Sequence, residues 1–537
     1  MTPGTDFEEL ERRDLALEEA ARSVVAIARE DQFGRGWRPK GIDEVAILLE
    51  SLGYSTDVVT ELWYPSIFAL ATDVSKLVDK YVTDRERTEA KDETWFKRAC
   101  RDYAIGSLYS GPWIIAILGL AVFGAALWSS LSTPLHLATA IAAGAYVGLV
   151  VSGFFSQSIA RRLTFYFLQE NVSMMAWTLD RFIAFTLVTY AVLGAAGWLG
   201  LRSTYGDPDA WLAASFFVGS GIFQDSLAPL YTMRRFAWIV AISLVTTLLT
   251  GATFVLFFHR RVDLPWEPAT LAAEVGAVGL AVMAATLLWV HRNVATGADH
   301  GSLVPPDRRA VLAASLPYAV YGSAYFLMIV IDHLAAGLAD GFPFRYRAGY
   351  ELGCDVALVA IIPVVGAVNA VLEELPRKIL ASANVVLGDG PAFDRALTRY
   401  YESSALIVLG AAVLTVGLAE TFGRTLLRSP FTGLSGPMAD EAEIVLRLAA
   451  LAYGILMLGL LGAQLLFFVS RPRVPVLAAL AGVLVNAAVG SAVVVTHAPA
   501  VWCAAGLLAA TITFTSIATV AAWHAMRRFT YSYYAAY

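Results

Sequence analysis

Twelve apolar stretches follow one another from residue 106 to residue 523, and they constrain the fold more than any other feature of this sequence. A bilayer-spanning helix needs about 20 mainly apolar residues. The stretches that meet this length lie at 106–130, 135–159, 180–200, 209–230, 235–258, 268–291, 309–332, 350–373, 403–420, 443–469, 474–496 and 499–523. The sequence therefore predicts an all-α polytopic membrane protein with about twelve transmembrane helices.

Charged residues are distributed unevenly along the chain. Residues 1–100 contain 21 acidic and 14 basic residues, whereas residues 101–537 contain 24 acidic and 25 basic ones. Soluble proteins carry about 25% charged residues. Residues 1–100 exceed this fraction and residues 101–537 fall well below it, so a water-soluble segment precedes a membrane domain. We expect residues 1–100 to form a small acidic helical unit in the cytoplasm, with helices near 6–30, 43–52 and 58–81.

The composition also excludes several classes of protein. The 16% of charged residues argue against a soluble enzyme or a disordered scaffold, and the net charge of -6 argues against a nucleic-acid binder. Cys100, Cys354 and Cys503 lie too far apart in the sequence for a metal-ligand spacing or a disulfide framework. We therefore expect no metal site, no cofactor and no nucleic-acid partner.

Basic residues indicate how the helices are oriented. With a cytoplasmic N-terminus, the inner loops and the C-terminal tail contain 16 Lys and Arg residues and the outer loops contain seven. Because positive residues favour cytoplasmic loops, the sequence predicts cytoplasmic N- and C-termini and an even number of spans. Two inner loops, 160–180 and 374–402, mix basic, aromatic and apolar residues as interfacial helices do, so they could lie on the lipid surface or dock a glycosyltransferase.

Two similar motifs suggest an internal repeat. The first span contains Ser110-Gly111-Pro112-Trp113 and the seventh contains Ser315-Leu316-Pro317-Tyr318, so both have the pattern Ser-x-Pro-aromatic. Related six-helix halves are typical of secondary transporters, although a pattern this short also recurs by chance. The predicted domains are 1–100 as the N-terminal unit, 101–291 as the N-lobe, 292–308 as a cytoplasmic linker and 309–537 as the C-lobe.

The run from Asp102 to Leu120, with its Ser110-Gly111-Pro112-Trp113 motif, resembles the first span of the PelG-like exopolysaccharide transporters of the MOP flippase superfamily. Ile331-Asp332-His333, Tyr350-Glu351 followed by Ile361-Ile362-Pro363, and Arg528 to Tyr531 are similar in style to later parts of that family. The resemblance covers roughly residues 100–537, and the acidic segment of about 100 residues before it departs from the family.

The resemblance implies a twelve-helix fold of two six-helix lobes and transport by alternating access. The implied cargo is an exopolysaccharide of the kind found in biofilms, or a lipid-linked glycan, exported across the bacterial inner membrane. The implied partners are membrane lipid, a cytoplasmic glycosyltransferase and other membrane subunits of a synthase complex. The N-terminal segment leaves the partner set and the exact substrate open.

Charged residues inside the predicted spans are the candidates for function, because charge in a membrane is costly and usually faces a cavity. Glu351 and Asp355 are four residues apart and share a helix face, and Asp332 and His333 end the preceding span at a similar depth. These residues predict an acidic outer vestibule. It could contact substrate or couple transport to protons or ions, or it could simply pair with Arg345 or Arg347.

Three further charged residues are candidates for the substrate cavity or for coupling. Asp225 lies near the end of the fourth span and could pair with Arg234 or Arg235 instead. Glu274 lies deeper, in the sixth span, with no partner near it in the sequence. Arg447 could bind a phosphate or carboxylate of a lipid carrier, or pair with a nearby acid.

The acid that could pair with Arg447 is Glu441 or Glu443.

The sequence contains no ATPase motif of the form GxxxxGK[ST], and its DxD motif, Asp207-Pro208-Asp209, has the pattern of a turn that caps a helix. We therefore expect a transporter and no enzyme. A membrane scaffold that anchors a polysaccharide synthase, and a membrane glycosyltransferase, remain as alternatives.

Overall fold

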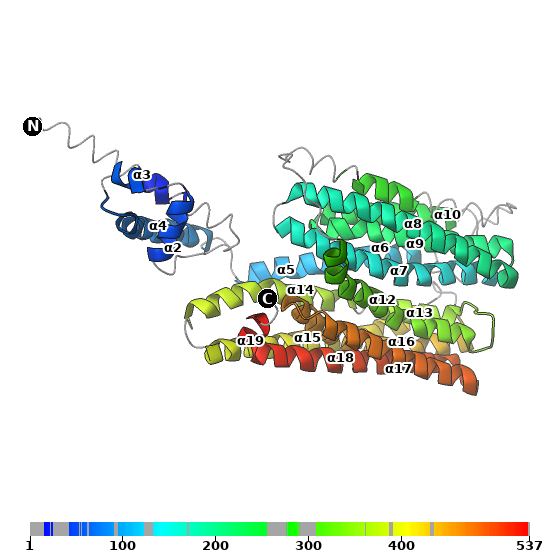
Figure 1. Ribbon diagram of the computed structural model, residues 1–537. Coiled ribbons are helices and arrows are strands. Elements are labelled where there is room, and N and C mark those ends of the chain that lie inside the picture. The colour runs from blue at the N-terminus through cyan, green and yellow to red at the C-terminus, as the bar shows by residue number, and fades with distance from the viewer. Residues whose placement is uncertain are drawn as a thin grey trace, which may run out of the picture. The chain divides into compact units, whose positions relative to one another are not determined.

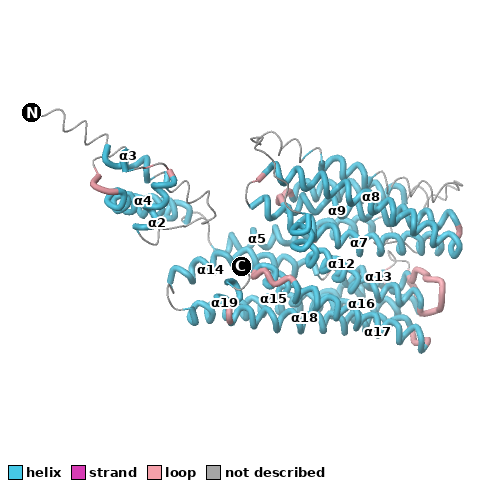
Figure 2. The backbone as a smooth tube through the Cα atoms, viewed as in Figure 1, coloured by secondary structure: helices cyan, strands magenta, loops and turns pink. Residues whose placement is uncertain are grey.

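The computed structural model describes most of the chain, and Figures 1 and 2 show its course. The described residues are 16–21, 23–24, 42–52, 54, 56–61, 64–90, 95–122, 133–168, 171–254, 275, 278–287, 289, 308–359, 361–385, 390–429 and 434–534. Within these ranges all regular secondary structure is helical and none is strand. The all-α fold class predicted from the sequence is therefore confirmed.

The chain divides into two compact units, Met1–Cys100 and Arg101–Tyr537. The first unit contains α2 (Ile42–Ser51), α3 (Thr56–Glu61) and α4 (Ile67–Ala90). Its small apolar core includes the fully buried side chains of Val45, Leu49, Val59, Leu70 and Val74. The single helix predicted at 58–81 is wrong, because the chain turns at Pro65 and Ser66, and the Ser66 hydroxyl accepts the Ala69 amide at the start of α4.

The second unit is a bundle of long helices. They are α5 (Trp95–Tyr109, which begins before the unit boundary), α6 (Gly111–Val122), α7 (Leu135–Leu168), α8 (Val172–Tyr205), α9 (Asp207–Thr232), α10 (Phe236–Phe254), α12 (Arg308–Leu338), α13 (Ala348–Leu358), α14 (Ile361–Val385), α15 (Gly390–Leu427), α16 (Pro437–Phe468), α17 (Arg473–Thr496), the short η3 (Ala500–Trp502), α18 (Cys503–Arg527) and α19 (Phe529–Tyr534). A further helical segment, Val278–Leu287, lies in the predicted sixth span.

Eight helical segments among the described residues are long and apolar enough to cross a membrane. They correspond to the predicted second, third and seventh to twelfth spans. The other four predicted spans contain α6, α9, α10 and Val278–Leu287. None of these four is among the helices that are both long and apolar enough. The helix α9 has 26 residues but carries Asp207, Asp209 and Asp225, and the described parts of the other three are shorter than α9.

Several predicted element boundaries are wrong because helices continue beyond the apolar stretches. The predicted inner loop 160–180 is mostly the end of α7 and the start of α8, and the predicted inner loop 374–402 is mostly the end of α14 and the start of α15. Polar residues are compatible with helix once the chain leaves the hydrocarbon, so hydropathy alone locates the membrane crossing and not the helix end. The eighth span is divided between α13 and α14.

The helix contacts repeat with an interval of six spans, which gives two six-helix lobes. In the N-lobe α7 packs on α9, α8 on α9, and α6 on α10. In the C-lobe the corresponding helices make the same pairs, since α13 packs on α16, α15 on α16, and α12 on α17. Figure 1 shows α7 to α10 gathered on one side of the bundle and α14 to α18 on the other.

The two lobes meet along two helix pairs that the repeat relates to each other. One pair is α7 with α12, where Gly153 and Gly322 approach so closely that a Cβ on Gly322 would collide with the Gly153 carbonyl oxygen. The other is α5 with α14, where a Cβ on Gly106 would lie 2.5 Å from the Asn369 Cβ and 3.0 Å from the Gly366 Cα. Small residues let helix backbones approach closely in membranes.

The two ends of the bundle are named as follows. The α5 end is the end with α5 and α19, and the α13 end is the end with the 339–347 connection.

Candidate functional site

Four of the sequence-predicted site residues lie together in the C-lobe. Asp332 and His333 are in the last third of α12, and Glu351 and Asp355 are on one face of α13. Their side chains are buried, with exposed fractions of 0%, 5%, 2% and 4%. With Cys354 they form what we call the α12–α13 cluster. The grouping agrees with the prediction, but the predicted outer vestibule is wrong because packing against α7, α16, α17 and α18 covers these groups.

Hydrogen bonds fix the orientation of each ionisable group in the cluster. His333 Nδ1 lies 2.7 Å from Glu351 Oε2. The Tyr350 hydroxyl donates to Asp332 Oδ2 at 2.6 Å, and Asn486 Nδ2, from α17, lies 3.5 Å from Asp332 Oδ1. Asn486 also donates to the Met328 carbonyl oxygen at 2.8 Å, which fixes its amide. A buried charge with such partners is less costly than a bare one, so this network lets the acids remain inside the bundle.

An aromatic residue of the N-lobe closes the cluster on one side. The ring of Tyr146, on α7, lies 5.4 Å from the His333 imidazole, and the Tyr350 ring lies 5.5 Å from it at 81°. Tyr146 and Tyr350 are fully buried. The cluster therefore lies where the two lobes meet, and a relative movement of the lobes would change its surroundings.

The alternative that pairs the cluster with Arg347 is wrong. Arg347 Nη1 lies 2.7 Å from Asp340 Oδ2 and its Nε lies 3.2 Å from Glu441 Oε1. Arg347 precedes the first turn of α13, so its side chain reaches the 339–347 connection and α16, while Glu351 and Asp355 face the interior. Arg345 uses its backbone amide, which donates to the Gly337 carbonyl oxygen.

Asp225 forms a separate buried site in the N-lobe. Its side chain is 2% exposed, its Oδ2 accepts the Tyr190 hydroxyl at 2.9 Å, and its Oδ1 has no hydrogen-bond partner among the described residues. The predicted pairing with Arg234 or Arg235 is wrong, because those residues follow the end of α9 and point elsewhere. Arg234 binds Glu373 of α14, and Arg235 lies over the Trp289 ring.

Arg447 belongs to an ion-pair network near the α13 end. Its Nη2 lies 3.0 Å from Glu443 Oε1, which confirms the predicted pairing with that acid, and its Nε lies 3.8 Å from Glu420 Oε2. Arg424 and Arg428 bind the same Glu443. The Arg447 side chain is about half exposed, unlike those of the α12–α13 cluster, and binding of a lipid-carrier phosphate stays a prediction. Glu274 lies outside the described residues.

The Ser-Gly-Pro-Trp motif marks a break between two helices. Ser110 forms the turn after α5, and Pro112 lies in the first turn of α6, where its missing N–H costs nothing. The Tyr109 ring before the motif stacks on Tyr231 at 5.4 Å, and the Tyr231 hydroxyl donates to the Tyr109 carbonyl oxygen. The motif therefore anchors the start of the first span to the end of α9.

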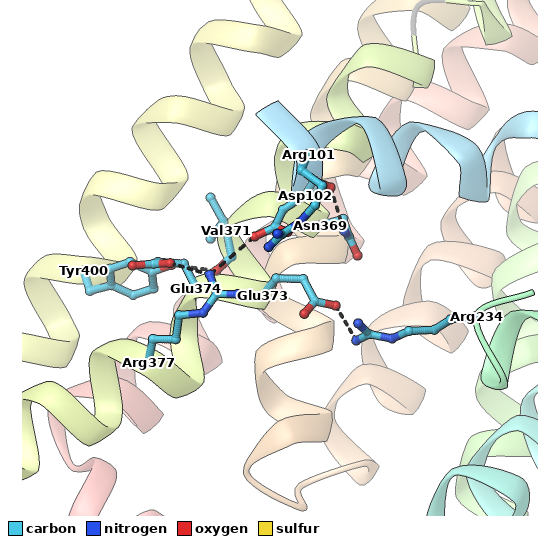
Figure 3. Close-up of polar contacts among 9 residues, drawn as sticks. All are labelled: Arg101, Asp102, Arg234, Asn369, Val371, Glu373, Glu374, Arg377 and Tyr400. Carbon is cyan, nitrogen blue, oxygen red and sulfur yellow. Dashed lines mark hydrogen bonds and ion pairs between the residues drawn. The ribbon is translucent and has the colours of Figure 1, made fainter. Parts of the chain in front are cut away.

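Ionic contacts connect the lobes at the α5 end (Figure 3). Arg234 Nη2 lies 2.6 Å from Glu373 Oε1, and the Asn369 side-chain amide donates to the Asp102 carbonyl oxygen at 3.0 Å. Arg377 Nη1 lies 2.9 Å from Glu374 Oε2 and 3.4 Å from Asp102 Oδ2. We call these contacts the α5-end latch.

Sequence reasoning missed most partners in these sites. Tyr146, Asn486 and Asn369 are polar but uncharged, so a search for charge inside spans passes over them. Asp102 lies just before the first apolar stretch, and Glu373 is the last residue of the eighth, where charge is ordinary. The available signal was a polar side chain within an apolar helix, such as Asn486 in the run GVLVNAAVG.

No protein-family model matches this sequence, and no curated protein matches it. Solved structures do match the fold. A MOP superfamily transporter from Pyrococcus furiosus Vc1 (DSM3638) matches with a TM-score of 0.52 and 12% sequence identity over 80% of this chain and 96% of that chain.

Two MATE transporters match in the same way. An outward-facing multidrug resistance MATE family transporter of the MOP superfamily has a TM-score of 0.50 and 11% identity, over 80% of this chain and 95% of that chain. The MATE transporter ClbM, solved in complex with Rb+, has a TM-score of 0.50 and 15% identity, over 83% of this chain and 98% of that chain. The second unit therefore has the two-lobed helical fold of the MOP superfamily transporters.

Proposed function

We propose that this protein is a secondary transporter that moves its cargo by alternating access between its two lobes. The observation that carries the proposal is the lobe interface. The lobes meet along the pairs α7–α12 and α5–α14, which the six-span repeat relates to each other, and a buried ionisable cluster lies beside the first pair. Two repeats that rock against each other around a central site are the usual basis of alternating access.

The proposed cargo is an exopolysaccharide of the Pel type or a lipid-linked glycan. The Ser110-Gly111-Pro112-Trp113 run and its surroundings support this cargo by resemblance. The carboxyl groups of Asp332, Glu351 and Asp355 support it by chemistry, since an amino-sugar polymer is partly cationic. They are buried in this arrangement, so the proposal requires that movement of the lobes uncovers them. The proposal also places the protein in a bacterial inner membrane with both termini in the cytoplasm, beside a glycosyltransferase and other synthase subunits.

Reconstitution tests this function directly. The full chain, placed in liposomes together with a cytoplasmic glycosyltransferase that makes an amino-sugar polymer, should deliver the labelled polymer to the opposite side of the bilayer. Liposomes with the synthase alone are the control. Delivery that is equal in both preparations would contradict the proposal. Delivery that survives when the lobes are chemically locked would favour the scaffold alternative, in which the membrane unit only anchors the synthase.

Charge reversal in the α5-end latch provides a second test. Arg234→Glu should shift the lobes toward a state open at the α5 end, because it places two like charges across the 2.6 Å contact with Glu373. A partly exposed ion pair contributes up to about 1 kcal/mol, which corresponds to a shift of about fivefold. The measurement is labelling of a Ser107→Cys reporter, in a Cys100→Ser background, by a maleimide that does not cross membranes.

The matched control is the double variant Arg234→Glu with Glu373→Arg, which restores opposite charges. It should return labelling to the level of the parent protein. If the single variant labels at the parental rate, the latch does not restrain the lobes. If the double variant labels as fast as the single one, the effect arises at position 234 alone.

A further inference from the structure

Three different metal-ligating side chains converge in the C-lobe. Asp332 and His333 from α12 and Cys354 from α13 each present a ligand atom, and these atoms all lie within 4.8 Å of one another. Asp332 and Cys354 are fully buried, and His333 is 5% exposed. A carboxylate, an imidazole and a thiol from two helices make a mixed donor set, in contrast to the sequence, whose cysteine spacing predicted no metal site.

The imidazole is oriented as metal-binding histidines are. His333 Nδ1 lies 2.7 Å from Glu351 Oε2, so this nitrogen donates its proton to the carboxylate. His333 Nε2 lies 4.0 Å from Asp332 Oδ2, which is too long for a hydrogen bond, so this nitrogen has no carboxylate hydrogen-bonded to it and can offer its lone pair to a metal ion when the ring is neutral. A carboxylate that fixes the far nitrogen of a ligating histidine is the common outer partner of zinc sites. Glu351 therefore leaves the Nε2 lone pair directed at the other donors.

The carboxylate ligand is held by outer partners as well. Tyr350 donates to Asp332 Oδ2 at 2.6 Å, and Asn486 lies 3.5 Å from Asp332 Oδ1. These residues come from α13 and α17, so two helices restrain one carboxylate on α12. Such restraint is what a preformed metal site requires, because the ligands need little reordering on binding.

A buried tyrosine beside the cluster lacks a polar partner. The hydroxyl of Tyr346, in the connection before α13, is buried and has no hydrogen-bond partner among the described residues. Burial, together with the nearby carboxylates of Glu351 and Asp355, raises the pKa of Tyr346 well above its usual value. Buried hydroxyls are normally satisfied, so the Tyr346 hydroxyl is an exception close to the carboxylates of the cluster.

We propose that Asp332, His333 and Cys354 bind one divalent cation of the zinc class. Thiolate and imidazole ligands select zinc-like ions over magnesium, calcium and alkali ions. The ion would displace the thiol proton of Cys354, and its two positive charges would offset the negative charges of the thiolate and the Asp332 carboxylate in a cluster that also contains the carboxyl groups of Glu351 and Asp355. Charge balance matters here because uncompensated charge inside a membrane is costly. The bound ion would clamp α12 to α13 beside Tyr146 of the N-lobe.

Cobalt(II) is the probe, because thiolate ligation gives a charge-transfer band in the near ultraviolet. The full chain, purified in detergent without a histidine tag, should bind one cobalt ion and show this band. Zinc should abolish the band, and magnesium, calcium and rubidium should not. Glu351→Gln should weaken cobalt binding by about 10- to 100-fold while the band remains, as expected for an outer partner of a metal ligand.

Matched cysteine variants show which thiol binds. Cys354→Ser should lose the band, whereas Cys503→Ser, which replaces another fully buried cysteine, should keep it. Gel filtration and thermal melting establish that each variant is folded. Because the ligands are buried, protein from zinc-supplemented cells is also assayed for metal content, where one zinc ion per chain is expected.

Folded wild-type protein with no band and substoichiometric zinc would overturn the proposal, and so would a band that survives Cys354→Ser. Metal binding is measured without transport. Its failure would therefore leave the transporter proposal intact, and a failed transport assay would leave the metal site intact.

Discussion

A disulfide bond between Ser107→Cys on α5 and Gly366→Cys on α14 is expected to stop transport completely and reversibly. The Ser107 hydroxyl oxygen lies 2.5 Å from the position that a Cβ on residue 366 would occupy, so the two thiols would be within reach of each other. That Cβ would also lie 2.9 Å from the Tyr103 carbonyl oxygen, so α5 and α14 must separate slightly to accept it. The bond would join the two lobes across the contact that must open in alternating access. Transport in liposomes should fall to background after oxidation and recover on reduction.

The disulfide experiment contains its own control, because the reduced double variant has the same sequence as the locked one. Cys100→Ser removes the exposed native cysteine from the background. Each single-cysteine variant should be insensitive to oxidant. Quantitative cross-linking with undiminished transport would show that α5 and α14 do not separate, and alternating access between these lobes would then be wrong.

Gly322→Ala is expected to have the second largest effect, on both stability and transport. The added methyl would collide with the Gly153 carbonyl oxygen of α7 and lie 2.7 Å from the Gln157 side chain. Overpacking of this kind costs about 1–3 kcal/mol, and here it falls on the contact that holds the lobes together. Thermal unfolding in detergent should occur several degrees lower. The transport rate should fall about tenfold, which corresponds to a cost of about 1.4 kcal/mol on the closed state.

Gly410→Ala is the matched control for that substitution. Gly410 lies in α15, and a Cβ added there would meet no atom of another element within 4 Å. Alanine is favoured over glycine in a helix interior by about 0.5–1 kcal/mol, so this variant should be unchanged or slightly more stable. If both variants behave alike, the close approach of Gly153 and Gly322 is not what determines stability.

Hydropathy predicted the membrane crossings well because each crossing is a local property. Eight of the twelve predicted spans coincide with helices that are long and apolar enough to cross a membrane. The helix ends were not predictable in the same way. The end of α7 around Arg161 and the start of α15 around Arg395 are helical but polar, so composition there gives no signal that distinguishes helix from loop.

The internal repeat illustrates a different limit. From the sequence it rested on Ser110-Gly111-Pro112-Trp113 and its counterpart near Pro317, a match short enough to arise by chance. In the structure it is visible as repeated packing, with α7 on α9 matched by α13 on α16. Helix packing can be preserved while the residues change, because many apolar side chains fill the same contact.

The site was predicted in part. The search for charge within spans found Asp332, Glu351 and Asp355, since such charge is rare in an apolar chain. It did not find that they are buried, and it assigned Asp225 a wrong partner. His333 bonds a residue 18 positions away, and Asn486 reaches Asp332 across 154 positions.

The sequence by itself determined that the chain is an all-α membrane protein of about twelve spans preceded by an acidic polar segment, because the bilayer acts on each stretch of about 20 residues independently. It also singled out the few charges inside those spans. Only the tertiary structure decided which of those charges meet and which arginine pairs with which acid at the ends of the bundle. It also decided that Cys354 lies beside His333. Such pairings depend on which helix faces touch, and the physical chemistry of single stretches of chain does not specify helix neighbours.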